Sequence, residues 1–418
     1  MTPLKRIAIA VCLAVGAVAA SSVFVPEVVQ AAEARAKISR AVGVPLQKAK
    51  EAMDAKDWDT ALAEIQKAQA VEKKAPHEEY QIDEFLAFVL VQQQKFGEAA
   101  PVYERMISSG LMPQDQVNVR TKAVAQMYFQ VKDYRKAADW AQKWLDSYGM
   151  AEDMGVLLGL AYYGLEDFQN AAAALTRVVD HIEQSNEVPK EDYLRYLFSS
   201  YVKLQDRPGI ENSLKRTVRH YPKPEYWDDL LEIYRRKSNS DRVTFGFYRL
   251  MNTVGVLKDK GEYMEMAQLG IEMGVPGESE KVMQQGVDKG ILKSDDKAEQ
   301  SRFERLLADS KKQAAADRAS LAQQAKEAEK SPKGQADVGL GEAYLSYGQY
   351  EEAIAAIERG IKKGGVNDVD EAQISLGIAY LESGQKEKAR EAFKAVKPGS
   401  RWADLAELWD LHAQSVSS

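Results

Sequence analysis

Four histidines, His77, His181, His220 and His412, are the side chains best suited to bind a transition metal. Such a site needs imidazole or thiolate ligands that converge on one ion. The histidines are far apart in the sequence, none belongs to an H-x-x-x-H arrangement, and the single cysteine is Cys12. We interpret each histidine as a surface or loop residue, and we predict no metal site and no cofactor.

The carboxylates show no catalytic arrangement either. General acid–base catalysis needs two acids that face one substrate, whereas neighbours such as Glu351 and Glu352 point to different sides of a helix. Nucleophile-elbow, phosphate-loop and dinucleotide-binding motifs are also missing from the sequence. We therefore predict no catalytic residues and no enzymatic activity. The alternative is an enzyme whose site lies in residues 296–330 or at the edge of the fold.

The composition describes a folded, acidic protein. Of the 418 residues, 45% are hydrophobic and 28% are charged, which argues against a disordered chain. The 56 basic and 63 acidic residues give a net charge of -7, so there is no basic excess of the kind that nucleic-acid binding requires. We predict a protein partner and no nucleic acid.

The first residues have the layout of a secretory signal peptide. Lys5 and Arg6 precede an almost wholly apolar stretch at residues 7–20, and small residues offer cleavage after Ala20 or after Ala31. We predict that residues 1–31 are removed, Cys12 among them, and that the mature protein has no transmembrane segment. The alternative is a retained membrane anchor, although the apolar stretch is short for a span of ~20 residues.

A five-residue pattern recurs along the rest of the chain. A polar residue and usually an aromatic are followed, after two variable residues, by alanine. The copies that we recognise end at Ala61, Ala99, Ala137, Ala171, Ala353 and Ala389. Within each run of copies the alanines are 34 to 38 residues apart. A period of this length indicates a repeat architecture.

A second pattern precedes the first. Leu-Gly-x-Ala-Tyr stands at residues 158–162, 340–344 and 376–380. The spacing of apolar residues predicts two amphipathic helices in each repeat. We expect the glycine of the first helix and the alanine of the second to let the helices approach closely. One pair cannot bury its apolar face alone, so the pairs must stack into a solenoid.

These motifs resemble the tetratricopeptide repeat (TPR). The resemblance implies an all-α helix-turn-helix solenoid, a right-handed superhelix of about ten helix pairs, some of them degenerate. We expect a solenoid over residues 32–330, a C-terminal pair of repeats with a capping helix over residues 331–418, and a joint at residues 331–334. The capping helix is predicted at residues 401–413, with Trp402, Leu405, Leu408 and Trp409 on one face.

Two segments remain open to two interpretations. Residues 311–330, rich in Ala, Gln, Lys and Glu, could form a protruding helix or flexible elbow, or an ordinary outer-face helix. The segment from Tyr221 to Trp227 contains two prolines, and its aromatics could form a recognition site or pack against the next helix.

The TPR resemblance also predicts a partner-binding groove lined by the first helix of each pair. The repeat positions that would face the groove are occupied by Gln81, Glu84, Phe88, Lys122, Gln126, Phe129, Asp153, Tyr163, Asp192, Arg195, Glu225, Asp228 and Glu232. The alternative for each of them is a solvated helix face. The Lys and Asn clamp of chaperone-binding TPR domains is not predicted, because the matching asparagines are missing.

Longer segments resemble a group of Gram-negative periplasmic TPR proteins that accompany TonB-ExbB-ExbD complexes. They run from Val188 to Trp227 and from Met266 to Gly290. The resemblance implies a periplasmic accessory whose partners are TonB, ExbB or ExbD homologues. The alternative is a structural adaptor in cell-envelope or exopolysaccharide assembly. Gly270 and Ser279 depart from the repeat pattern, which expects Tyr and Ala, so we expect looser packing there.

Overall fold

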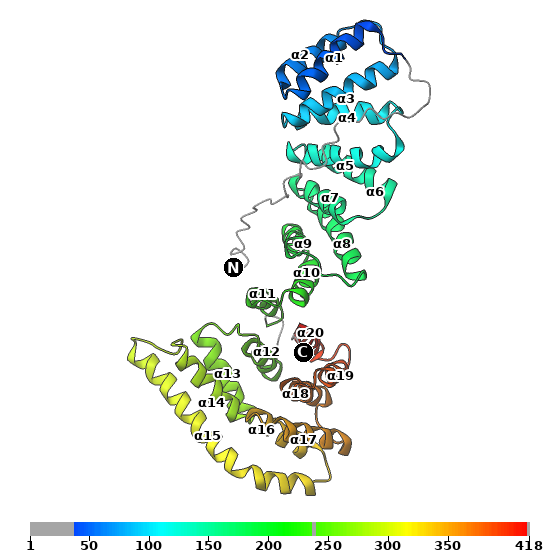
Figure 1. Ribbon diagram of the computed structural model, residues 1–418. Coiled ribbons are helices and arrows are strands. Elements are labelled where there is room, and N and C mark those ends of the chain that lie inside the picture. The colour runs from blue at the N-terminus through cyan, green and yellow to red at the C-terminus, as the bar shows by residue number, and fades with distance from the viewer. Residues whose placement is uncertain (1–36, 236–239, 416–418) are drawn as a thin grey trace. The chain divides into compact units, whose positions relative to one another are not determined.

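The computed structural model describes residues 37–235 and 240–415, and all regular structure in these ranges is helical (Figure 1). The predicted all-α fold of stacked helix pairs is confirmed. The described chain divides into two compact units, of which the first ends at Ile210 and the second begins at Glu211. The predicted signal segment, residues 1–31, lies outside the described residues.

The first unit is a series of antiparallel helix pairs, each packed against the next. Its helices are α1 (Arg40–Asp54), α2 (Trp58–Gln69), α3 (Pro76–Gln92), α4 (Phe96–Ser108), α5 (Gln114–Gln130), α6 (Tyr134–Tyr148), α7 (Glu152–Gly164), α8 (Phe168–Gln184), α9 (Glu191–Leu204) and the start of α10 (Arg207–His220). The first helices of successive pairs are also neighbours, since α5 contacts α7 and α7 contacts α9.

The polar residue of the recurring pattern starts the second helix of several pairs. The carboxylates of Asp57, Asp133 and Asp167 each accept a hydrogen bond from the backbone N–H three residues later, the usual role of an N-cap. The alanine that follows is fully buried in each of these pairs. The pattern is therefore a cap, an aromatic at the first helical position and a close helix contact.

The glycines of the Leu-Gly-x-Ala-Tyr pattern give room to a large side chain of the second helix. A Cβ at Gly159 would lie 2.7 Å from Leu175. A Cβ at Gly341 would lie 2.4 Å from Ile357, and a Cβ at Gly377 would lie 2.3 Å from the Phe393 ring. The predicted close approach is confirmed, and it is chiefly the residue four positions after the repeat alanine that fills the space.

The second unit continues with paired helices and then departs from them. It contains the rest of α10, followed by α11 (Pro224–Arg235), α12 (Asp241–Thr253), α13 (Lys260–Glu272), α14 (Pro276–Asp288), α15 (Lys297–Lys330), α16 (Gln335–Ser346), α17 (Tyr350–Lys363), α18 (Val369–Glu382), α19 (Lys386–Lys394) and α20 (Ala403–Ser415).

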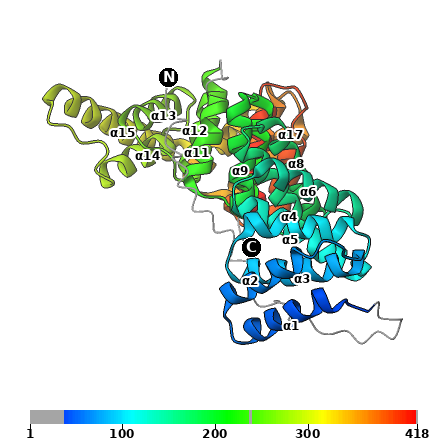
Figure 2. The same cartoon turned by 90° about the horizontal axis from the view of Figure 1, so that it is seen from above.

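Helix α15 corrects the expected count of about ten pairs. It is one continuous helix of 34 residues where a degenerate pair was expected. Its buried residues, Phe303, Ser310, Ala314, Leu321 and Ala328, follow a helical spacing along one face. That face packs against α13, α14 and α16, and α13, α14 and α15 lie side by side in both views (Figures 1 and 2). The interpretation of residues 311–330 as a protruding or elbow segment is therefore wrong.

Helix α20 joins parts of the second unit that are distant in sequence. It packs against α18 and α19, as a capping helix should, and it also contacts α12. Trp402, Leu405, Leu408 and Trp409 are all buried, so the predicted apolar face is confirmed. At Gly246 of α12, a Cβ would lie 2.3 Å from Leu405. The second unit thus closes on itself through α12 and α20.

Trp227 and His412 take part in the same closure. Their rings meet edge to face at 6.0 Å, and Trp409 contacts His412 at 5.9 Å. Trp227 and Tyr226 are buried, which confirms for these two the interpretation that the aromatics after Tyr221 pack against other helices. The interpretation of His412 as a surface or loop residue is wrong, because it belongs to helix α20 and lies half-buried against the rings of Trp227 and Trp409.

The sequence boundary at residue 331 stays a prediction. Helix α15 ends at Lys330, as the Ser-Pro-Lys-Gly segment predicts, but α15 and α16 both belong to the second unit. In the part of the chain that the structure describes, no helix combines the length and apolar character needed to cross a membrane.

Candidate functional site

The predicted groove residues of α3 are partly exposed. Gln81, Glu84 and Phe88 keep some accessible surface, and Phe88 meets Trp58 edge to face at 6.1 Å. Burial raises the pKa of Glu84, and the positive charge of Arg120 on α5 opposes this shift. Glu84 therefore offers a half-buried carboxylate rather than a fully solvated one.

On α5 the structure brings a predicted basic residue to a predicted acidic one. Lys122 forms an ion pair with Asp153 of α7 and lies over the Trp144 ring, 5.5 Å from its centre. Phe129 is buried against Tyr134, whereas Gln126 is partly exposed. The Lys122–Asp153 pair links two neighbouring repeats and neutralises both charges.

The predicted residues of α7 and α9 meet through aromatic contacts. Tyr163 contacts the rings of Phe168 and Tyr196, each at 5.3 Å, and its hydroxyl is hydrogen-bonded to Ser199 at 2.8 Å. One turn of α9 also carries an ion pair between the partly exposed Arg195 and the exposed Asp192, 3.4 Å apart. These contacts show that much of the predicted set in the first unit is already engaged within the fold.

The remaining predicted residues lie on α11 in the second unit. Asp228 accepts hydrogen bonds from Lys258 at 2.7 and 2.8 Å, Glu232 pairs with Arg235 at 2.8 Å, and Glu225 is exposed. Sequence reasoning missed the neighbouring Asp229. Burial, followed by the charge of Asp228, raises the pKa of Asp229 to about 6. Whether any of the predicted residues contacts a partner stays a prediction.

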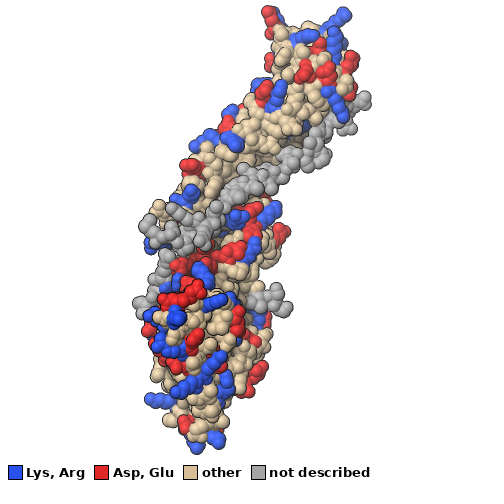
Figure 3. All heavy atoms as spheres, turned by 90° about the vertical axis from the view of Figure 1, so that its left-hand side faces the viewer, with Lys and Arg blue, Asp and Glu red and all other residues tan. Residues whose placement is uncertain are grey.

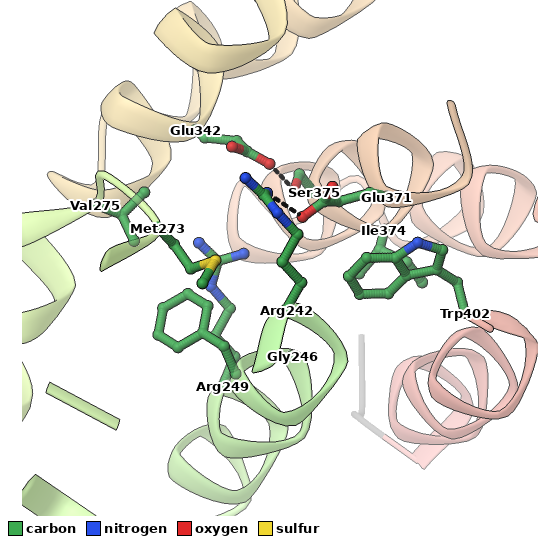
Figure 4. Close-up of a pocket in the computed structure, with 11 residues that line it drawn as sticks. Arg242, Gly246, Arg249, Met273, Val275, Glu342, Glu371, Ile374, Ser375 and Trp402 are labelled. Carbon is green, nitrogen blue, oxygen red and sulfur yellow. Dashed lines mark hydrogen bonds and ion pairs between the residues drawn. The ribbon is translucent and has the colours of Figure 1, made fainter. Parts of the chain in front are cut away.

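A charged pocket in the second unit was also missed. Its lining comes from α12, the turn between α13 and α14, α16, α18 and the residue before α20 (Figure 4). The lining residues are Arg242, Phe245, Gly246, Arg249, Met273, Val275, Glu342, Glu371, Ile374, Ser375 and Trp402. No repeat position marks this set, because the pocket depends on the contact of α12 with distant helices.

Ion pairs organise the pocket. Arg242 donates a hydrogen bond to Glu371 at 2.8 Å. Arg249 donates two to Glu278, at 2.8 and 2.7 Å, and lies over the Phe245 ring at 4.5 Å. Glu342 accepts a hydrogen bond from Ser375 at 3.1 Å. The two ion pairs thus join α12 to α18 and to α14, and the Glu342–Ser375 hydrogen bond joins α16 to α18.

The charges on the surface show a similar mixture. Figure 3 shows Lys and Arg side chains lying among Asp and Glu side chains over one face of the second unit, in the lower part of the view. Within residues 37–235 and 240–415, no group of three or more His, Cys, Asp or Glu residues is arranged to hold a metal ion.

The repeat identity of the C-terminal helices follows from comparison with known proteins. Residues 338–402, which run from α16 through α19, match the tetratricopeptide repeat family. The fold is a TPR solenoid. No curated protein matches the sequence.

Similar solved structures share low sequence identity with this chain. A tetratricopeptide repeat protein from Parabacteroides merdae ATCC 43184 is 13% identical and covers 89% of this chain and 99% of its own, with a TM-score of 0.28. YrrB, described as a TPR protein with an unusual peptide-binding site, is 13% identical over 43% of this chain and 85% of its own, with a TM-score of 0.30. MamA from Desulfovibrio magneticus RS-1 is 16% identical over 49% of this chain and 100% of its own, with a TM-score of 0.29.

Proposed function

We propose that this chain is a scaffold that binds protein partners through the first helices of its TPR pairs. The TPR fold supports a protein–protein interaction scaffold in general. The observation that carries the proposal is the row of partly exposed polar and aromatic side chains on α3, α5, α7 and α9, such as Gln81, Gln126 and Tyr163. Repeat helices that place mixed side chains side by side suit the recognition of an extended or helical segment.

We further propose that the scaffold works in the periplasm as an accessory of a TonB-type energy-transduction system for outer-membrane uptake. Two sequence features support this finer proposal: the signal-like residues 1–31, and the resemblance of the segments around Tyr221–Trp227 and Met266–Gly290 to TonB-associated TPR proteins. TonB, ExbB or ExbD homologues would be the partners. The alternative function is a structural adaptor in cell-envelope or exopolysaccharide assembly.

Site-specific crosslinking in intact cells tests the partner and the face together. A photoreactive phenylalanine analogue is placed at Gln81 or Gln126, on first helices, and at the exposed Asp139 of α6 as a control on a second helix. We expect a TonB or ExbD homologue to be captured from Gln81 and Gln126 but not from Asp139. Equal capture from all three positions, or capture from Asp139 alone, would reject the first-helix face.

Growth and fractionation test the location and the pathway. The protein should appear in the periplasmic fraction, and a deletion strain should fail to grow on iron–siderophore or haem sources. Normal growth on these sources together with an envelope or polysaccharide defect would favour the structural adaptor. Recovery of the processed protein from the cytoplasm would contradict both.

A further inference from the structure

The C-terminal repeats turn their first helices, α16 and α18, towards α12 of the same unit (Figure 4). The pocket lining as a whole follows no repeat position, but two of its carboxylates do. Glu342 stands two residues before the tyrosine of its Leu-Gly-x-Ala-Tyr pattern. On α5, Gln126 stands at the same distance before Tyr128. Glu342 therefore occupies the repeat position from which Gln126 is predicted to face a partner.

Glu371 of α18 shows the same correspondence. It stands nine residues before Tyr380. The predicted groove residue Asp153 stands nine residues before Tyr162 on α7. Ile374 follows Glu371 on α18 and also lines the pocket. The face that is predicted to receive a partner in the first unit is thus turned towards α12 in the second.

Helix α12 presents a complementary row of side chains. Arg242, Gly246 and Arg249 recur at helical spacing on one face of the helix, and all three line the pocket. Arg242 forms an ion pair with Glu371 at 2.8 Å. Burial raises the pKa of Glu342, and the charge of Arg249 is the largest opposing influence. Two guanidinium groups of α12 therefore face two carboxylates of the C-terminal repeats.

The contact of α12 with α18 and α20 is called the seam below. It is made by Arg242 and Gly246 on α12 and by Glu371, Trp402 and Leu405 on the facing side. A space for one water-sized group remains among the side chains. The ion pair is partly open to solvent, with its Arg and Glu side chains 46% and 20% exposed, so it adds little stability. Opening the seam would break this pair and uncover apolar surface, while the helix pairs on either side stay intact.

We propose that α12 is an internal occupant of the first-helix face of the C-terminal repeats, and that a partner helix with the same side chains competes with it. Such a helix carries two arginines seven residues apart with a small residue between them. Its guanidinium groups would bind Glu342 and Glu371, since arginine pairs well with carboxylates. The inference rests on the proposed scaffold function and adds a second, autoinhibited face to it.

A peptide with the sequence of residues 240–254 is the probe. It carries a fluorescein label, and fluorescence anisotropy follows its binding to the full chain. A control peptide has both arginines replaced by glutamate. In the protein, Arg242→Glu places like charges across the seam and leaves the carboxylates of α16 and α18 unchanged. Arg242→Gln removes the same ion pair without repulsion.

A matched variant controls for the loss of any ion pair in this unit. Arg390→Glu breaks the pair of Arg390 with Asp410, whose side chains are 34% and 16% exposed. This pair joins α19 to α20 and takes no part in the seam. Circular dichroism checks that each variant keeps its helical content, and Arg242→Gln decides the test if Arg242→Glu fails to fold.

We expect the peptide to bind the Arg242→Glu variant roughly tenfold more tightly than the wild type, because the binding-competent open unit becomes more populated. Its affinity for the Arg242→Gln variant should lie between the two. The Arg390→Glu variant should bind like the wild type. The control peptide should bind none of these proteins.

Several results would overturn the inference. They are equal binding of the peptide to the wild type and to both Arg242 variants, the same gain in affinity with Arg390→Glu, equal binding of the control peptide, or no detectable binding to any folded variant. Capture of a partner from Gln81 or Gln126 does not depend on these results. The scaffold function therefore stands if that capture succeeds while the peptide test fails.

Discussion

Ser279 and Gly270 lie in direct contact between α14 and α13, and the Ser279 hydroxyl donates a hydrogen bond to the backbone carbonyl of Ala267 at 2.7 Å. Both residues depart from the TPR pattern, yet both are buried. The hydroxyl occupies the space that a side chain at position 270 would need. Two departures that suggested loose packing compensate for each other.

This contact predicts a coupled effect of two substitutions. A Cβ at Gly270 would lie 2.4 Å from Ser279 Oγ, so Gly270→Ala should lower the free energy of unfolding by about 1–3 kcal/mol, the usual range for overpacking. Removing the hydroxyl with Ser279→Ala should make the same change much less costly. Denaturant unfolding of the four variants of a double-mutant cycle measures the coupling. Additive effects would show that the two residues do not compensate.

Two glycines of α16 provide a matched pair. At Gly341 a Cβ would lie 2.4 Å from Ile357, whereas at the exposed Gly339 it would meet nothing within 4 Å. We expect Gly341→Ala to destabilise the protein by about 1–3 kcal/mol. Gly339→Ala should stabilise it by up to about 1 kcal/mol, since alanine favours a helix. In thermal unfolding, the melting temperature should fall for Gly341→Ala and rise for Gly339→Ala. Shifts in the same direction would contradict the packing described here.

The turns inside the helix pairs predict a second contrast. Lys132 has a φ of 63° and Glu166 one of 58°, whereas Gly348 takes the equivalent place before α17 with a φ of 75°. This left-handed conformation costs roughly 1 kcal/mol for residues other than glycine. Lys132→Gly should therefore raise the melting temperature and Gly348→Ala should lower it. A fall with Lys132→Gly would indicate that the lysine side chain contributes more than its backbone strain costs.

The half-buried His412 predicts a pH dependence of the second unit. Burial lowers the pKa of His412 to about 4, below its ordinary value of 6.5. The unfolded chain then takes up a proton first, so stability falls as the pH drops from about 6.5 towards 4. Each pKa unit is worth about 1.4 kcal/mol, so the loss between pH 7.5 and 5 should be about 2 kcal/mol at most.

The His412→Phe variant isolates this contribution. Phenylalanine keeps a ring between Trp227 and Trp409 but cannot take up a proton. Urea unfolding at pH 7.5 and at pH 5 should show a smaller loss of stability for the variant than for the wild type. Parallel losses would show that carboxylates elsewhere, and not His412, cause the pH dependence.

The sequence predicts the features that recur and misses those that occur once. The buried alanines and the glycines facing Leu175, Ile357 and Phe393 are visible because close helix contacts need small residues at the same place in each repeat. Helix α15 is hidden by its polar, alanine-rich composition, since only one narrow face is buried. Because residues 297–330 carry few repeat motifs, the sequence does not show that one long helix stands there in place of a helix pair.

The charged pocket and the position of His412 could not be predicted from the sequence for another reason. Both arise where α20 and α18 meet α11 and α12, and a repeat period says only which neighbours in the sequence will pack together. The predicted first-helix residues were found by repeat position, but their ion pairs, such as that of Lys122 with Asp153, depend on which side chains face each other in space.

The contact of α20 with α12 has a consequence for how the chain acquires its structure. Each pair of the first unit packs on its neighbour, so that unit can assemble step by step as the chain grows. The second unit must wait for α20 before α11 and α12 can bury Trp227 and the surface around Gly246. During synthesis, α11 and α12 therefore keep apolar surface exposed until α20 has been made. They are the part of the nascent chain that most needs protection from aggregation.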